Sequence, residues 1–244
     1  MHKMDTLGLF GYNVTNWFDL KPRTGVLQND IISFIKLKEG GLTDNPSDSA
    51  SKRPVGVPYT SKGKTTDKWH TNKGITWGVF KDYASKLGYA ATAENFYKMP
   101  DDIWFKIYNE IYYKPFANIT TSPLINYYIS LWAWGSGVGG AKSLLSKIGQ
   151  DLNGYIAKYG EKNTLLLLVK ARIAFYERLI AQKPTNKVFL QGWVNSAISF
   201  YKNFEAYAKD NGEKPSSAVV DEVKKKAKSG IGYIGLVVGI IFVS

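Results

Sequence analysis

The chain of 244 residues contains no cysteine and only two histidines. Disulfide bonds and cysteine metal sites are therefore excluded, and a histidine-based metal site lacks ligands. A phosphate-binding loop is also missing, because the glycine-rich run at 135–140 follows an aromatic helical pattern and not a strand. We expect no metal and no cofactor, so any catalysis must rest mainly on carboxylates and hydroxyls.

Strand periodicity is scarce, since hardly any stretch alternates between apolar and polar residues. Helical spacing begins at Leu27, with Asn29 or Asp30 as the expected N-cap. We expect this helix to stop at Gly40 and Gly41, which places Glu39 in its last turn. The sequence predicts a mainly α protein with at most a small β element. Further helical segments are expected near 73–88, 101–115, 122–137, 139–149, 161–182 and 188–209.

Acidic residues are few relative to basic ones, which gives a net charge of +12. This excess favours a polyanionic partner such as nucleic acid, anionic lipid or an acidic cell-wall polymer. The basic residues form no stripe along one predicted helix, so we expect no nucleic acid partner. Residues 51–73 are locally basic and lie within a long loop at 43–73, and loops of this length are more often functional than idle.

The two ends of the chain lack different features. The start lacks a secretory signal, and the end lacks charged residues. The first 26 residues have no continuous apolar core, so we interpret them as an N-terminal extension. Residues 231–244 carry no charge and follow a lysine cluster. As a helix they would span only about 21 Å, short of the roughly 30 Å hydrocarbon core. We predict membrane association through Ile231 to Ser244, with docking on the protein itself as the alternative.

The run FIKLKEGG at 34–41 places Glu39 at a helix end. Cleavage of a glycosidic bond needs a carboxylic acid that is still protonated near neutral pH. The negative end of the helix dipole and burial under aromatic residues would both raise the pKa of Glu39. From the spacing alone, however, an ordinary solvated residue is the simpler interpretation.

Two motifs carry a family resemblance. The segment KLKEGGLTDNPSD at 36–48, followed by HTNKGITWGVF at 70–80, resembles the paired signature of glycoside hydrolase family 108. These muramidases are lysozyme-like enzymes of phages and bacterial secretion systems. The stretches IYNEIYYKPF and AWGSGVGGAKSLL extend the similarity, and residues 172–196 resemble the predicted peptidoglycan-binding domain that usually follows. The resemblance covers roughly residues 27–200.

The resemblance implies roles for individual residues. The Glu of the Glu-Gly-Gly run is the catalytic acid of the family, and it matches Glu39. Phage-type lysozymes place an Asp nine residues later and then a Thr, which correspond to Asp48 and Thr76, although Asp44 competes with Asp48. An inverting enzyme would use them to activate water. The candidate substrate-binding residues are Thr71, Asn72, His70, Trp77 and Tyr112.

The chain also departs from the family pattern. The loop between the two motifs is longer than in short members, and LWAWGSG replaces an Asp-x-x-x-Asn-Ser-Gly segment. The predicted activity is hydrolysis of the β-1,4 bond between N-acetylmuramic acid and N-acetylglucosamine in peptidoglycan. A lytic transglycosylase, or a cell-wall-binding or secretion-accessory protein that does not cleave, remains an alternative.

The expected organisation follows from these segments. An enzyme made in the bacterial cytoplasm would act at the cell envelope, reached through a holin-type export partner, through lysis or by its own tail. The expected divisions are an extension at 1–26, a lysozyme-like domain at 27–134, a peptidoglycan-binding helical module at 135–209, a basic linker at 210–230 and an apolar tail at 231–244.

Overall fold

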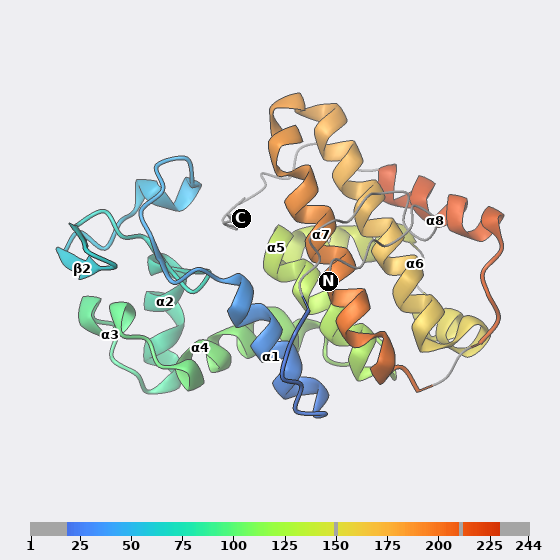
Figure 1. The fold of residues 1–244 in the computed structure, drawn as a ribbon, viewed down its shortest axis with the longest axis horizontal. Coiled ribbons are helices and arrows are strands. Elements are labelled where there is room, and N and C mark those ends of the chain that lie inside the picture. The colour runs from blue at the N-terminus through green and yellow to red at the C-terminus, as the bar shows by residue number, and fades with distance from the viewer. Residues whose placement is uncertain (1–18, 149–150, 210–211, 230–244) are drawn as a thin grey trace.

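The computed structural model describes residues 19–148, 151–209 and 212–229 of the chain (Figure 1). The fold is mainly α with a small β element, which confirms the predicted fold class. The helices are α1 (Leu27–Lys38), α2 (Trp77–Ala84), α3 (Ala93–Tyr97), α4 (Asp101–Tyr108), α5 (Pro123–Ile148), α6 (Leu152–Gln182), α7 (Lys187–Phe204) and α8 (Ser217–Lys228). The strands are β1 (Leu42–Thr43), β2 (Tyr59–Ser61), β3 (Lys64–Thr66), β4 (Thr71–Asn72) and β5 (Ile75–Thr76).

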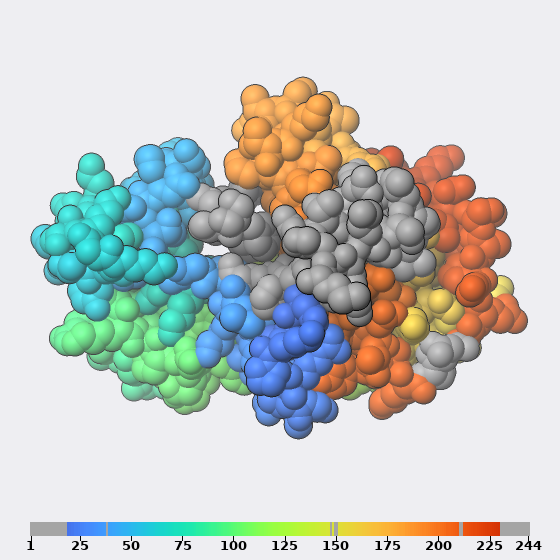
Figure 2. All heavy atoms as spheres, viewed as in Figure 1, coloured from blue at the N-terminus to red at the C-terminus, as the bar shows by residue number. Residues whose placement is uncertain are grey.

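The strands form two small antiparallel units. In the order β1-β4-β5, Thr71 of β4 pairs with Thr43 on one side and with Thr76 on the other. Strands β2 and β3 form a separate hairpin within the long loop expected at 43–73. Space-filling atoms show this hairpin at one end of the molecule and helices α6 to α8 toward the other (Figure 2). Strands this short gave no readable periodicity in the sequence.

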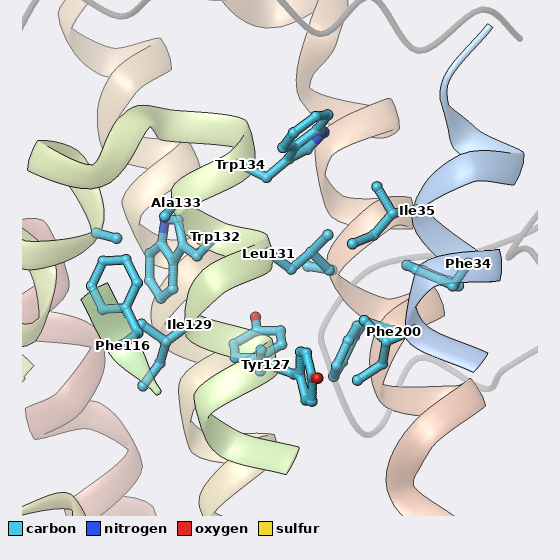
Figure 3. Packing of buried hydrophobic residues seen from close by; sticks show 14 of the residues in the cluster. Phe34, Ile35, Phe116, Tyr127, Ile129, Leu131, Trp132, Ala133, Trp134 and Phe200 are labelled. Carbon is cyan, nitrogen blue, oxygen red and sulfur yellow. The ribbon is translucent and has the colours of Figure 1, made fainter. Parts of the chain in front are cut away.

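Helix α1 packs its apolar face on the middle of the molecule. Phe34 meets the rings of Phe200 and Phe204 at centroid distances of 5.8 and 5.5 Å, in edge-to-face geometry. Figure 3 shows Phe34 and Ile35 of α1 facing Leu131 of α5, with Phe200 of α7 alongside. Because α5 is buried almost continuously from Leu124 to Trp134, it lies at the centre of the core and connects the β units to the later helices.

Two features of the later helices bear on the expected organisation. Helix α5 runs across the predicted boundary between residues 134 and 135, and its kink lies at Gly137, where φ is +75° and ψ is 155°. The segment expected as a basic linker contains α8, which is capped by Ser216 and buries Val223 and Ala227. The lysines of this segment dominate its composition and conceal the helical spacing of its small apolar face.

The start of α1 differs from the sequence prediction. The helix begins at Leu27 as expected, but Asn29 and Asp30 lie inside it and Val26 occupies the N-cap position. Asp30 instead reaches back, accepting hydrogen bonds from Thr24 N at 2.7 Å, from the Thr24 hydroxyl at 2.7 Å and from Gly25 N at 3.3 Å. The Tyr207 hydroxyl also donates to it. One buried carboxylate thus joins the segment before α1 to the residues after α7.

Asp30→Asn is expected to lower the free energy of unfolding at pH 7 by about 2 kcal/mol, since hydrogen bonds to a charged group are worth roughly 1.5 to 3 kcal/mol. Burial alone would raise the pKa of Asp30, but the hydrogen bonds from Tyr207, Thr24 and Gly25 outweigh it and hold the pKa below its ordinary value. A lowered pKa stabilises the folded state above the unfolded pKa of about 3.9, and this contribution is lost as pH falls through the folded value.

Urea unfolding at pH 7 and at pH 3 measures this effect. The wild-type protein should lose more stability between the two pH values than Asp30→Asn does. The control Asp102→Asn removes an exposed carboxylate that pairs with Lys106, and it should follow the wild-type profile. Parallel profiles for wild type and Asp30→Asn would contradict the assignment.

Candidate active site

Glu39 lies one residue beyond helix α1, which ends at Lys38. Its backbone is extended, with φ −93° and ψ 112°, and its N–H donates to the Lys36 carbonyl at 3.2 Å. The prediction that Glu39 belongs to the last helical turn is therefore wrong by one residue. Gly41 then takes a positive φ of +87°, and the chain turns into β1. This exit directs the Glu39 side chain away from the helix surface and toward α5.

Trp134 of α5 holds the Glu39 carboxylate. Its indole Nε1–H donates to Glu39 Oε1 at 2.7 Å, across 95 positions of sequence. Trp134 is itself only 8% exposed and is enclosed by three aromatic rings. Those of Tyr112, Tyr108 and Trp104 lie 4.8, 5.4 and 5.7 Å from it, centroid to centroid. A donor fixed in this way fixes one carboxylate oxygen in turn.

Gly74 lies against the other carboxylate oxygen. It is the second residue of the two-residue turn between β4 and β5, with φ +77°. A Cβ atom at this position would lie 2.4 Å from Glu39 Oε2 and 2.5 Å from Trp134 Cζ2. Both distances are far below van der Waals contact, so only glycine fits. The Glu39 carboxylate is thus confined between an indole N–H and a backbone turn.

A pocket of about 200 Å³ opens beside Glu39. It places two carboxylates, one lysine and several hydroxyl and backbone groups around one space. The lining residues are Glu39, Gly40, Gly41, Leu42, Thr43, Asn45, Asp48, Lys62, Thr71 and Gly74. The Glu-Gly-Gly run supplies one wall, and β4 with its turn supplies another. Both motifs that carried the family resemblance therefore meet at this pocket.

Asp48 is 3% exposed and reaches the pocket from the start of a 3₁₀ turn at Ser49–Lys52. Its Oδ1 accepts a hydrogen bond from Ala50 N at 2.9 Å, so the carboxylate also caps that turn. Its Oδ2 lies 3.9 Å from His70 Nδ1, which is too long for a hydrogen bond. Asp44, the competing acid, pairs instead with Lys64 at 2.5 Å.

His70 is fully buried and sets the direction of the Thr71 hydroxyl. His70 Nε2 lies 3.2 Å from the Asn45 carbonyl oxygen, and Nδ1 lies 3.0 Å from Thr71 Oγ1. A carbonyl only accepts, so Nε2 carries a proton, and in the tautomer protonated at Nε2 alone Nδ1 accepts a hydrogen bond from the Thr71 hydroxyl. The Thr71 oxygen is then left as an acceptor toward the pocket that it lines.

Three other sequence-predicted residues stabilise the packing of the three-stranded sheet against α2 and α3. The Thr76 hydroxyl caps α2 by accepting from Val79 N at 3.3 Å. The Asn72 side chain donates to the carbonyls of Phe96 and Tyr97 at 2.6 and 3.2 Å. Trp77 is half-buried, with its ring 5.9 Å from that of Phe80 and 5.3 Å from that of Phe96. None of the three lines the pocket described above.

Tyr112 lies on the π-helical turn Asn109–Tyr113 that continues α4, against Trp134. Burial, together with the negative charge of Glu39, raises the pKa of Tyr112 to about 12. Its hydroxyl therefore stays neutral at any pH near 7 and adds no second negative charge beside Glu39.

Sequence reasoning missed three residues of this site. Trp134 lies in the LWAWGSG segment, which departs from the family pattern. No local pattern in the sequence pairs it with Glu39. Gly74 was readable as part of a turn, since Lys-Gly follows a strand-like pair, but not as a close approach. Lys62 was seen only as one of many basic residues in the long loop.

Comparisons with known protein families indicate the class of protein to which this pocket belongs. Residues 32–137 match the model for glycosyl hydrolase 108, and residues 150–198 match that for a predicted peptidoglycan domain. No curated protein and no solved structure shows a significant match. The chain therefore carries a glycosyl hydrolase 108 domain followed by a predicted peptidoglycan domain, and together they support a glycoside hydrolase that acts on peptidoglycan. This confirms the family resemblance found in the sequence.

Proposed function

We propose that the protein is an N-acetylmuramidase. It hydrolyses the β-1,4 bond between N-acetylmuramic acid and N-acetylglucosamine, with Glu39 as the general acid. The observation that carries the proposal is the position of Glu39, whose carboxylate lines the pocket between Trp134 and Gly74.

Proton donation follows from the two carboxylate oxygens. Because Trp134 Nε1–H already donates to Oε1, a proton on the carboxyl group belongs on Oε2. Oε2 is the oxygen beside Gly74, which lines the pocket. A glycosidic oxygen bound there would receive the proton as the bond to the sugar carbon breaks.

Asp48 and Thr71 are proposed to hold the attacking water. An ionised Asp48 accepts hydrogen bonds only, and with His70 protonated at Nε2 the Thr71 hydroxyl donates its proton to Nδ1. A water bound to both would use both of its hydrogens and keep a lone pair to attack the sugar carbon, while Asp48 takes up the proton that the water loses. Thr71 thereby takes the role that the spacing had assigned to Thr76, and His70 acts through Thr71 as a positioning residue.

Product analysis tests this function. Soluble peptidoglycan strands digested by the wild-type protein should give fragments with a reducing N-acetylmuramic acid end, visible by mass spectrometry after borohydride reduction. A lytic transglycosylase would give anhydromuramoyl ends that are lighter by one water and resist reduction. Reducing N-acetylglucosamine ends, or strands that stay uncut, would equally contradict the proposal.

The remaining parts of the molecule are proposed to deliver this activity. Residues 150–198 would retain the enzyme on its substrate, within the helical module expected at 135–209. The membrane role of residues 231–244 stays a prediction because these residues lie outside the described part of the chain, and a holin-type export partner likewise stays a prediction. None of the described helices is long and apolar enough to cross a bilayer. Within the same described ranges, no three His, Asp or Glu side chains are grouped as metal ligands would be.

A further inference from the structure

The tip of the β2–β3 hairpin reaches the pocket that contains Glu39. Strand pairing runs from Tyr59 opposite Thr66 to Ser61 opposite Lys64, which leaves Lys62 and Gly63 as a two-residue turn. Lys62 lines the pocket, and its Nζ lies 3.4 Å from the Gly40 carbonyl oxygen. A segment outside both family motifs thus adds a cation to the mouth of the site.

The backbone at this turn does not favour a lysine. Lys62 has φ +48° and Gly63 has φ +78°, the pattern of a hairpin turn in which both central residues are left-handed. Asn, Asp and Gly adopt this conformation readily, whereas a long side chain at the first position is uncommon. Turn formation therefore gives no reason for a lysine here.

A second turn of the same kind provides an internal comparison. Lys73 and Gly74 between β4 and β5 have φ +48° and +77°. The Lys73 amine is tied to the protein, at 2.9 Å from the Met99 carbonyl and 2.9 Å from Asp101 Oδ1. Lys62, in contrast, has no carboxylate within ion-pair distance among the residues that the structure describes, and its side chain is exposed. The Lys62 amine is therefore available to a ligand in the pocket.

The base of the hairpin fixes the backbone position from which the Lys62 side chain extends. The rings of Tyr59 and Tyr97 stack at a centroid distance of 4.4 Å, and Trp69 Nε1 donates to the Tyr59 carbonyl at 2.7 Å. The hydroxyls of Thr60 and Thr65 lie 2.6 Å apart across the strands. Because β2 is held to Trp69 and Tyr97 and β3 is paired to β2, the hairpin turn is held at the pocket mouth.

The charges of the pocket and of its substrate suggest a role for the Lys62 amine. The pocket holds the carboxylate of Asp48 in addition to the acid Glu39, and an ionised Asp48 repels an acidic substrate. The muramic acid units of peptidoglycan are acidic, through either the lactyl carboxyl group or the peptide attached to it. We propose that Lys62 binds this carboxylate and so selects the sugar that enters the pocket. The proposal rests on the muramidase function proposed above.

Lys62→Asn tests this role, because Asn suits the turn and the variant lacks the long side chain and its positive charge. Three soluble substrates separate the sources of the carboxylate: strands that carry their peptides, strands stripped by an amidase to expose the lactyl carboxylate, and stripped strands amidated with methylamine. KM and kcat are obtained from the release of reducing ends. We expect KM to rise about fivefold on at least one charged substrate and to stay within about twofold on the amidated one, as for the loss of an exposed ion pair.

The charged substrate that shows the effect identifies the carboxylate. The control Lys68→Asn removes the same charge from an exposed position outside the pocket, and its KM should change by less than twofold at physiological salt, where screening is strong. Equal changes for Lys62→Asn on all three substrates, or no change on any, would overturn the proposal while leaving the muramidase function intact. Wild-type protein that cleaves none of the three would overturn both.

Discussion

Glu39→Gln is expected to lower kcat for peptidoglycan hydrolysis by about a thousandfold, in the range that general acid catalysis contributes. The amide oxygen of Gln can still accept the Trp134 hydrogen bond, so the side chain should keep its place. Only the proton is lost. The amide also occupies the same volume beside Gly74, so KM should change by less than about threefold if binding is unaffected.

Reducing-end release from soluble strands measures the effect, with thermal unfolding to verify the fold. The matched control is Glu94→Gln on α3. It removes an exposed carboxylate that pairs with Lys98 and does not line the pocket. It should retain wild-type kcat. Activity of Glu39→Gln above a tenth of the wild-type value would remove Glu39 from the role of general acid.

Much of the fold was readable because it depends on local signals. The apolar spacing after Leu27, the Pro at 123 and the Gly at 88 mark helix limits that the structure retains. Helix α8 was missed because lysines outnumber its few apolar residues. The short strands were missed for a different reason: pairs of two residues are stabilised by their partners and not by their own pattern.

Only part of the site could be predicted from the sequence. The two carboxylates lie in motifs, whereas Thr71 and Trp134 are brought to them by the fold. Glu39 and Asp48 follow from the resemblance to known families, since spacing alone favoured a solvated Glu39, and both line the pocket. Thr76 was chosen by order along the chain, but its hydroxyl caps α2, and its partner in the antiparallel pair, Thr71, is the residue that lines the pocket. Register of this kind, and the meeting of Glu39 with Trp134, are properties of the folded chain that no local pattern contains.

Gly74→Ala is expected to reduce kcat/KM by more than about a hundredfold, because displacement of a catalytic group by about 1 Å has effects of that size. The added methyl group would lie 2.4 Å from Glu39 Oε2 and 2.5 Å from Trp134 Cζ2. Neither atom can yield easily: Glu39 is bonded to Trp134, and Trp134 is packed among aromatic rings. Either the carboxylate or the turn must move, and the site is disturbed in both cases.

Backbone strain must be separated from this collision, because alanine at φ +77° costs about 1 to 2 kcal/mol in any surroundings. Gly88→Ala provides the control, since Gly88 has φ +72° and its added methyl group would meet nothing within 4 Å. Both variants should lose that backbone contribution in urea unfolding. Only Gly74→Ala should also lose activity, measured at a temperature where both remain folded. Equal activity of the two variants would mean that the close approach of Gly74 to the Glu39 carboxylate is not needed for catalysis. The proposed role of Gly74 in confining Oε2 would then be wrong.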